Sequence, residues 1–219
     1  MHEIELKAHL EHPEKTEVRL ARIADFSFRC VKSDRYWTLG EKTVRVRREL
    51  VAGKETVWVT HKQKQYAGTI ETNRELEFEL PVSSVPVFIE MLESLGMIRT
   101  AEKQKDTKVF LPHSSLFTAD ILEDARSVSA ELSVIHPLGY FLEIEVLYPD
   151  ENSDTAASER HIRNARIIFD TLLAALEIPR SAIEVRPYNE LLASQLLCKY
   201  IKRRHVYSVN FSFLFYRFC

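Results

Sequence analysis

Acidic side chains stand at every second position in two short segments of this 219-residue chain, EIELK near the N-terminus and LEIE in its second half. The segments carry four carboxylates: Glu3, Glu5, Glu143 and Glu145. Alternate residues of a β-strand point to the same face, so each segment would present two carboxylates side by side. Carboxylate oxygens are the ligands that hard divalent cations prefer. The pattern therefore indicates a candidate site for Mg²⁺ or Mn²⁺.

Basic side chains alternate in the same way in the middle of the chain. VRVR places Arg45 and Arg47 on one face, and EKQK does the same for Lys103 and Lys105. Such groups bind phosphate oxygens, arginine through a two-point fork and lysine as a point charge. If the acidic and basic faces pointed into one interior, unpaired buried charges would be costly. A polyphosphate that carries a divalent metal would compensate both signs.

The same alternation has a simpler interpretation. An ordinary antiparallel sheet packs one face on a core and leaves the other in water, and charged solvent faces are common. Acids and bases are clustered on separate segments here, whereas solvent faces normally mix polar residue types, so the interior interpretation is favoured. About eight strands are enough to close a barrel whose inward side chains meet.

The composition argues against several other classes of protein. The 30 basic and 32 acidic residues leave a net charge of −2, so no overall charge attracts nucleic acid or a membrane surface. The five glycines cannot build a glycine-rich phosphate loop, and the three separated cysteines indicate neither disulfides nor zinc. No signal peptide and no run of about 18 apolar residues is evident. We therefore expect a cytoplasmic protein that binds no nucleic acid.

Period-2 segments dominate the chain and predict a meandering antiparallel sheet, since most of them are sequential neighbours with short connections. Helices are expected where apolar residues recur at three- and four-residue spacing. The expected strands cover residues 3–10, 26–30, 36–39, 43–50, 55–62, 70–80, 97–111, 116–124, 127–135 and 140–148. The expected helices cover residues 13–24, 83–96, 158–177 and 187–204.

Several of these segments resemble, in order, the signature motifs of the CYTH family, the triphosphate tunnel metalloenzymes. EIELK is similar to the ExExK motif of that family, and LGYFLEIE is similar to its closing LGxFxEIE motif. The intervening segments that resemble family motifs are KSDRYW, VRVR, VTHK, NRELEFEL and EKQK. RPYNELL, at 186–192, resembles a segment of the class IV adenylyl cyclase-like branch.

The resemblance implies an α+β fold, an antiparallel eight-stranded closed β-barrel or tunnel with helices packed on its outer face. It assigns residues 1–178 to the tunnel domain and 179–204 to a C-terminal helix that packs on the barrel. The apolar tail at 205–219 matches nothing in the family and is too short to span a bilayer. An interfacial membrane contact, an added strand and a non-native terminus stay open as explanations of the tail. Dimers occur among relatives, which makes a homodimer one option.

Residue by residue, the resemblance implies roles for the charged positions. The implied metal ligands are Glu3, Glu5, Glu143 and Glu145. The implied substrate-binding residues are Lys7, Arg45, Arg47, Lys62, Arg74, Lys103 and Lys105. The implied catalytic residues are Lys7, Arg45, Arg47, Glu143 and Glu145. Two positions depart from the family pattern, because Lys105 stands where arginine is frequent and Ser133 stands where many members carry aspartate. Glu131 has the same strand parity as Ser133 and is a candidate replacement.

The implied function is a metal-dependent enzyme that acts on a triphosphate-bearing small molecule, with Mg²⁺ or Mn²⁺ as cofactor. In the class IV adenylyl cyclase-like case, ATP is converted to cyclic AMP and pyrophosphate. A triphosphatase that hydrolyses tripolyphosphate, thiamine triphosphate or a nucleoside triphosphate would use the same residues. A non-catalytic module that binds polyphosphate or nucleotide is a second alternative. The motifs for binding are shared, so they do not separate these three functions.

Overall fold

The computed structural model describes the backbone of residues 2–67, 70–149 and 155–195. Its side chains are described for residues 3–61, 76–149 and 157–195. The tail at 205–219 therefore lies outside the described residues, and so do the side chains of Lys62 and Arg74. The chain divides into two compact units, Met1–Val185 and Arg186–Cys219, and the candidate site lies in the first.

In its described residues, the first unit is an α+β structure built on eight antiparallel strands, the number that the resemblance implied. The alternating sequence predicted the antiparallel sheet but divided it into ten strands. The strands are β1 (His2–Leu10), β2 (Ala24–Leu39), β3 (Lys42–Val51), β4 (Lys54–Ala67), β5 (Ile70–Glu79), β6 (Ile98–Pro112), β7 (Ser127–Ile135) and β8 (Gly139–Tyr148). The α-helices are α1 (Pro13–Ile23), α2 (Val85–Ser94), α3 (Ala119–Leu122) and α4 (Thr155–Ala175). The short 3₁₀ turns in the described part of the chain are η1 (Val82–Ser84), η2 (Ser114–Leu116) and η3 (Arg180–Ala182).

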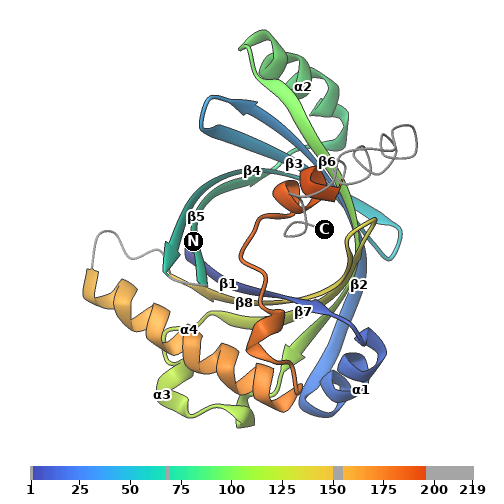
Figure 1. The fold of residues 1–219 in the computed structure, drawn as a ribbon. Coiled ribbons are helices and arrows are strands. Elements are labelled where there is room, and N and C mark those ends of the chain that lie inside the picture. The colour runs from blue at the N-terminus through green and yellow to red at the C-terminus, as the bar shows by residue number, and fades with distance from the viewer. Residues whose placement is uncertain (1, 68–69, 150–154, 196–219) are drawn as a thin grey trace, which may run out of the picture. The chain divides into compact units, whose positions relative to one another are not determined.

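The strands follow one another around a ring in the order β1-β5-β4-β3-β2-β6-β7-β8, and β8 pairs with β1 again (Figure 1). Among the described residues, the pairing between β1 and β5 covers His2 to Glu5 on β1. Beyond it, the backbone N–H of Glu184 donates to the carbonyl of Lys7 at 2.8 Å, and Ile183 bridges to Ala8. One edge of β1 is therefore shared between β5 and the segment that follows η3.

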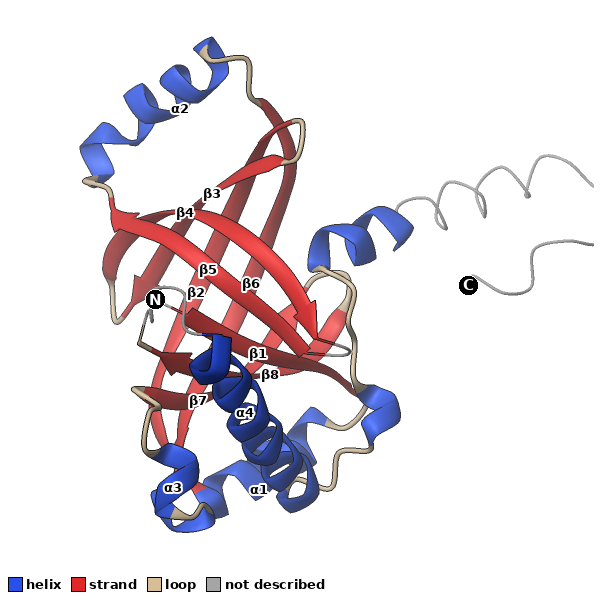
Figure 2. Cartoon of the chain, turned by 90° about the vertical axis from the view of Figure 1, so that its left-hand side faces the viewer, coloured by secondary structure: helices blue, strands red, loops and turns tan. Residues whose placement is uncertain are grey.

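Two apolar clusters lie on the outer face of the strands. The larger joins β1 and β8 to α4, with Ile4 and Leu6 packed in the same cluster as Ile168 and Leu172. The smaller joins β2, β3 and β4 to α2 and consists of Trp37, Val46, Val57, Val59, Val85 and Leu92. Figures 1 and 2 show α4, α1 and α3 on one side of the ring of strands and α2 on the opposite side. Because successive residues of a strand point to opposite faces, the charged residues between these apolar positions face the interior.

Residues 116–124, predicted as a strand, instead form the end of η2 and the short helix α3. That prediction was wrong because the apolar residues of this segment do not alternate strictly. Phe117 and Ile121 are four positions apart, a spacing that fits a helical turn. Ile121 is buried in the larger cluster, and Phe117 packs against it.

The separate strands predicted at 26–30 and 36–39 are parts of one continuous strand, β2. The intervening KSDR residues read as a break because they are polar. Lys32 and Asp34 are nevertheless buried, since they point into the interior of the barrel rather than into water. A charged inward face therefore disguised the middle of this strand.

In the second unit, residues 188–195 are helical, within the helix predicted for 187–204. The packing of residues 179–204 on the barrel stays a prediction. Among the residues that the structure describes, no helix is both long enough and apolar enough to cross a membrane.

Candidate functional site

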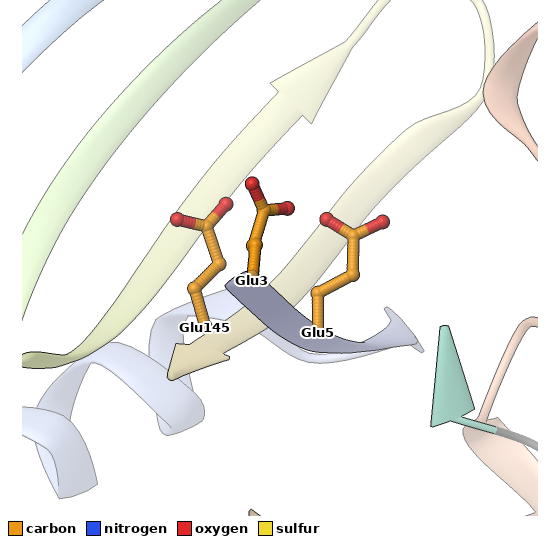
Figure 3. Close-up of side chains that lie close together, drawn as sticks. All are labelled: Glu3, Glu5 and Glu145. Atoms are coloured by element: carbon orange, nitrogen blue, oxygen red, sulfur yellow. The ribbon is translucent and has the colours of Figure 1, made fainter. Parts of the chain in front are cut away.

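Three of the four predicted metal ligands come together on the inner face of β1 and β8. Antiparallel pairing places Glu5 directly opposite Glu145, and Glu3 lies two positions away on β1. One carboxylate oxygen of each residue lies within 4.8 Å of those of the other two. Figure 3 shows the three side chains rising from the same side of the two strands. We call Glu3, Glu5 and Glu145 the acidic trio.

The electrostatics of the acidic trio fit a divalent cation. Burial, and then the negative charges of Glu131 and Glu3, raise the pKa of Glu145 well above its ordinary value. Glu3 is 9% exposed, and Glu5 and Glu145 are half-buried. Carboxylates this close repel one another unless a proton or a cation compensates them. Mg²⁺ and Mn²⁺ take oxygen ligands and would relieve this repulsion.

Glu143, the fourth predicted metal ligand, belongs to a different set of charges. It accepts a hydrogen bond from the Nζ of Lys105, which also donates to Glu131 at 2.7 Å. The other oxygen of Glu131 accepts from Lys32 at 2.5 Å. We call these four residues the buried ion network, and each of them is at most 6% exposed. Two lysines and two glutamates thus balance one another inside the barrel.

The pKa values of the buried ion network follow from this pairing. Burial lowers the pKa of Lys105, but Glu131 and Glu143 together raise it above its ordinary value. Burial raises the pKa of Glu131, but Lys105 and Lys32 together lower it below its ordinary value. Both groups are therefore charged at neutral pH. The phosphate-binding role of Lys105 stays a prediction, since two carboxylates already hold its ammonium group.

Ser133 stands where the motif that the chain resembles has aspartate, and its side chain meets a hydroxyl group. Its hydroxyl lies 3.0 Å from the hydroxyl of Thr107, and both residues are buried. Glu131, the candidate replacement, has each of its oxygens bonded to a lysine. It therefore supports the cations of the buried ion network rather than extending the acidic trio.

Glu131→Gln is expected to lower the free energy of unfolding by roughly 3 kcal/mol, because Lys32 would lose its carboxylate partner in the network and Lys105 would lose one of two. Urea denaturation followed by circular dichroism measures this loss. The matched control is Glu17→Gln, which breaks a half-exposed pair with Lys108 and should cost less than about 1 kcal/mol. Equal losses in the two variants would contradict the assignment of a costly buried network.

The predicted phosphate ligands Arg45, Arg47 and Lys103 form a basic group on β3 and β6. Arg47 donates from Nε and Nη2 to the two carboxylate oxygens of Asp34, at 2.7 and 3.0 Å. The Nζ of Lys103 lies 3.4 Å from the same carboxylate. Burial lowers the pKa of Lys103 to about 8, against the opposing effect of Asp34. This lysine is therefore mostly protonated at neutral pH and loses its charge under mildly alkaline conditions.

Arg45 is held differently from the other two members of the basic group. Its Nη2 donates to the Thr60 hydroxyl at 2.9 Å and to Glu77 at 3.3 Å. Thr60 in turn donates to Glu77 at 2.5 Å, which fixes the guanidinium from one side. The Nε of Arg45 is buried and has no hydrogen-bond partner among the described residues. An N–H donor of this kind suits an incoming anion, because a buried donor without an acceptor is costly.

The structure describes the remaining predicted site residues in less detail. Lys7 is half-buried on β1 and lies opposite Glu143 in the strand register. Lys62 and Arg74 belong to β4 and β5, but their side chains lie outside the described part of the chain. Sequence reasoning missed Lys32 and Asp34, although their alternation in KSDRYW was a visible signal that both share one face.

No protein-family model matches the chain, and no curated protein matches its sequence. Solved structures do share its fold. The PH1819 protein of Pyrococcus horikoshii is 20% identical, with a TM-score of 0.71 over 88% of this chain and 99% of that one. A candidate adenylate cyclase from Vibrio parahaemolyticus is 17% identical, with a TM-score of 0.61 over 87% and 97%.

A candidate adenylyl cyclase from Hippeastrum with a dominant triphosphatase activity is 12% identical, with a TM-score of 0.53 over 84% of this chain and 90% of that one. At identities this low, the likeness establishes a common fold. A fold hosts more than one function, so the activity has to be argued from the residues of the site.

Proposed function

We propose that this protein is a metal-dependent enzyme of the CYTH type that processes a triphosphate inside its barrel. The observation that carries the proposal is the presence of the acidic trio and the basic group in one interior. The acidic trio suits a hard divalent cation, and two arginines with a lysine suit phosphate oxygens. A triphosphate with its metal ion presents both kinds of partner at once.

The acidic and basic residues of the barrel would have different roles in this reaction. Glu3, Glu5 and Glu145 would hold a divalent metal, which supplies Lewis acidity and neutralises charge on the triphosphate. Arg45 and Arg47 would bind phosphate oxygens and stabilise the negative charge that grows on them as a P–O bond breaks. The protein would thus contribute positioning and electrostatics, which carry most of the catalysis in phosphoryl transfer.

The first candidate reaction is that of an adenylyl cyclase. The 3′-oxygen of ATP would form a bond to the α-phosphorus, and the bond from that phosphorus to the bridging oxygen of the β-phosphate would break. Pyrophosphate leaves, and the hydroxyl proton passes to solvent. The resemblance of RPYNELL to the class IV branch supports this reaction, and so does the candidate adenylate cyclase among the structures of this fold.

The second candidate reaction is hydrolysis of the triphosphate. Water would attack the γ-phosphorus, and the bond to the β-bridging oxygen would break to release orthophosphate. The dominant triphosphatase activity of the Hippeastrum protein favours this candidate. Both reactions need the same metal and the same cations, so the charged interior supports them equally.

A single assay separates these reactions. The purified protein is given ATP, tripolyphosphate or thiamine triphosphate with Mg²⁺ or Mn²⁺, and ³¹P NMR identifies the products. We expect cyclic AMP with pyrophosphate from ATP. Orthophosphate from any of the three substrates would assign the protein as a triphosphatase. Binding without turnover would leave a non-catalytic polyphosphate module, and neither binding nor turnover would overturn the proposed function.

A further inference from the structure

Asp34 is fully buried inside the barrel and lies between two cations of the basic group. It is on β2, where the strand register places it directly opposite Arg47 on β3 and Lys103 on β6. Arg47 occupies both carboxylate oxygens, and one of them is also approached by Lys103 at 3.4 Å. Tyr36 donates its hydroxyl to that oxygen at 3.3 Å. The contacts therefore surround this carboxylate with donors.

The surroundings exclude two common roles for a buried carboxylate. A divalent cation bound to the Asp34 carboxylate would lie close to the guanidinium of Arg47 and the ammonium of Lys103. These positive charges would repel the metal ion. Proton transfer needs a pKa near the working pH. Burial raises the pKa of Asp34, but the charges of Arg47 and Lys103 outweigh burial and hold that pKa well below its ordinary value. What remains is an effect on the two cations themselves.

We propose that Asp34 is a positioning residue for triphosphate binding, which holds Arg47 and Lys103 side by side and charged before the anion arrives. The inference rests on the proposed function, because it assigns both cations to the phosphates. Two cations held at one carboxylate from the strands that flank β2 would otherwise repel one another. The carboxylate removes that repulsion and leaves the three side chains with one net positive charge. It also fixes the plane of the Arg47 guanidinium through a two-point contact.

The protonation of Lys103 makes this role measurable. The charged groups that act on Lys103 include Asp34 on β2, Arg47 on β3, Lys105 on β6 and Glu143 on β8. Of these four, Asp34 and Glu143 favour the protonated lysine, while Arg47 and Lys105 disfavour it. Without the charge of Asp34, Lys103 would release its proton at a lower pH. Phosphate affinity should then begin to fall at a lower pH as well.

The test compares wild type with Asp34→Asn, which keeps the shape of the side chain and removes its charge. Binding of tripolyphosphate is measured by calorimetry in EDTA between about pH 6 and pH 9, a range that brackets the pKa of Lys103. In the wild type, we expect affinity to fall as pH rises through about 8. In Asp34→Asn, the fall should begin at least about one pH unit lower, and kcat with Mg²⁺ should drop by about 10²-fold.

Two further variants separate positioning from a general structural effect. Asp106→Asn removes another two-point Asp–Arg contact between β2 and β6, the exposed one with Arg29, and should leave binding and kcat unchanged. Asp34→Glu keeps the charge but moves the carboxylate by one methylene. It should retain the wild-type pH dependence of binding while lowering kcat, and it keeps the proposal testable if Asp34→Asn does not fold.

Each outcome bears on either the inference or the proposed function. An unchanged pH dependence and unchanged kcat in Asp34→Asn would overturn the positioning role alone. Wild-type kcat in Asp34→Glu would overturn it too, because the position of the carboxylate would then not matter. If the wild type binds no tripolyphosphate at any pH and turns over none of the three candidate substrates with Mg²⁺ or Mn²⁺, the proposed function is wrong and the inference falls with it.

Discussion

Glu145→Gln is expected to lower metal-dependent turnover by about 10²–10³-fold, the scale on which the loss of one preorganised charge acts at a reacting phosphate. Glutamine keeps the size of the side chain but supplies no anionic oxygen for a hard cation. The variant should nevertheless fold, because it removes one of three mutually repelling carboxylates. Loss of activity without loss of stability is therefore the expected signature.

The metal dependence of thermal unfolding gives a second measurement that needs no substrate. Saturating Mg²⁺ or Mn²⁺ stabilises a protein that binds it only when folded, by about 2.7 kcal/mol at 100 times Kd. We expect the Tm of the wild type to rise on metal addition, and that of Glu145→Gln to rise much less. In the absence of metal, the Tm of the variant should equal or exceed that of the wild type.

Glu143→Gln is the matched control, because Glu143 lies on the same strand and faces the same interior. It contacts Lys105 and lies outside the acidic trio. This variant should lose stability, because Lys105 loses one of its two carboxylates, but it should keep its rise in Tm on metal addition. If Glu143→Gln lost that rise while Glu145→Gln kept it, the metal site would be centred on the wrong glutamate.

The sequence predicted which residues of a strand share a face. It did not predict which residues lie opposite them on the neighbouring strands. Strict alternation located residues 127–135 and 140–148 to within one residue of β7 and β8. It also predicted that Arg45 and Arg47 share a face, because the side-chain period of a strand is two. Period alone does not set how far one strand is shifted along the next. The resemblance therefore assigned four glutamates to one metal site, and only the structure showed that Glu5 lies opposite Glu145.

Lys105 is a second example of what the sequence period does not predict. Its alternation with Lys103 placed both on one face, and both were assigned to phosphate. The structure separates them, because Lys105 meets Glu131 and Glu143 while Lys103 meets Asp34. That difference depends on the registers of β2, β6, β7 and β8, which bring residues far apart in sequence to the same level. The pattern of charges thus predicted an interior lined by charged side chains, but it did not predict which of these side chains form ion pairs.

Arg45→Gln is expected to raise KM and to lower kcat, with kcat/KM falling by about 10²–10³-fold. Its buried Nε donor has no partner among the described residues, so an anion in the barrel would gain a hydrogen bond that no described protein group supplies. Contacts that strengthen as charge develops on the phosphates lower the barrier to reaction as well as the dissociation constant. Steady-state kinetics on the substrate identified by ³¹P NMR measures both parameters.

The control for this prediction is Arg48→Gln, three positions along the same strand. Arg48 lies among the outward-facing positions of β3, is 39% exposed through its side chain and pairs with Glu55, so its loss should change neither KM nor kcat. A rise in KM without a change in kcat for Arg45→Gln would mean that Arg45 binds the ground state and the transition state equally. Unchanged values of both would contradict its place in the phosphate site. The predicted result, in which both parameters change, requires that the arginine contact grows stronger during the reaction.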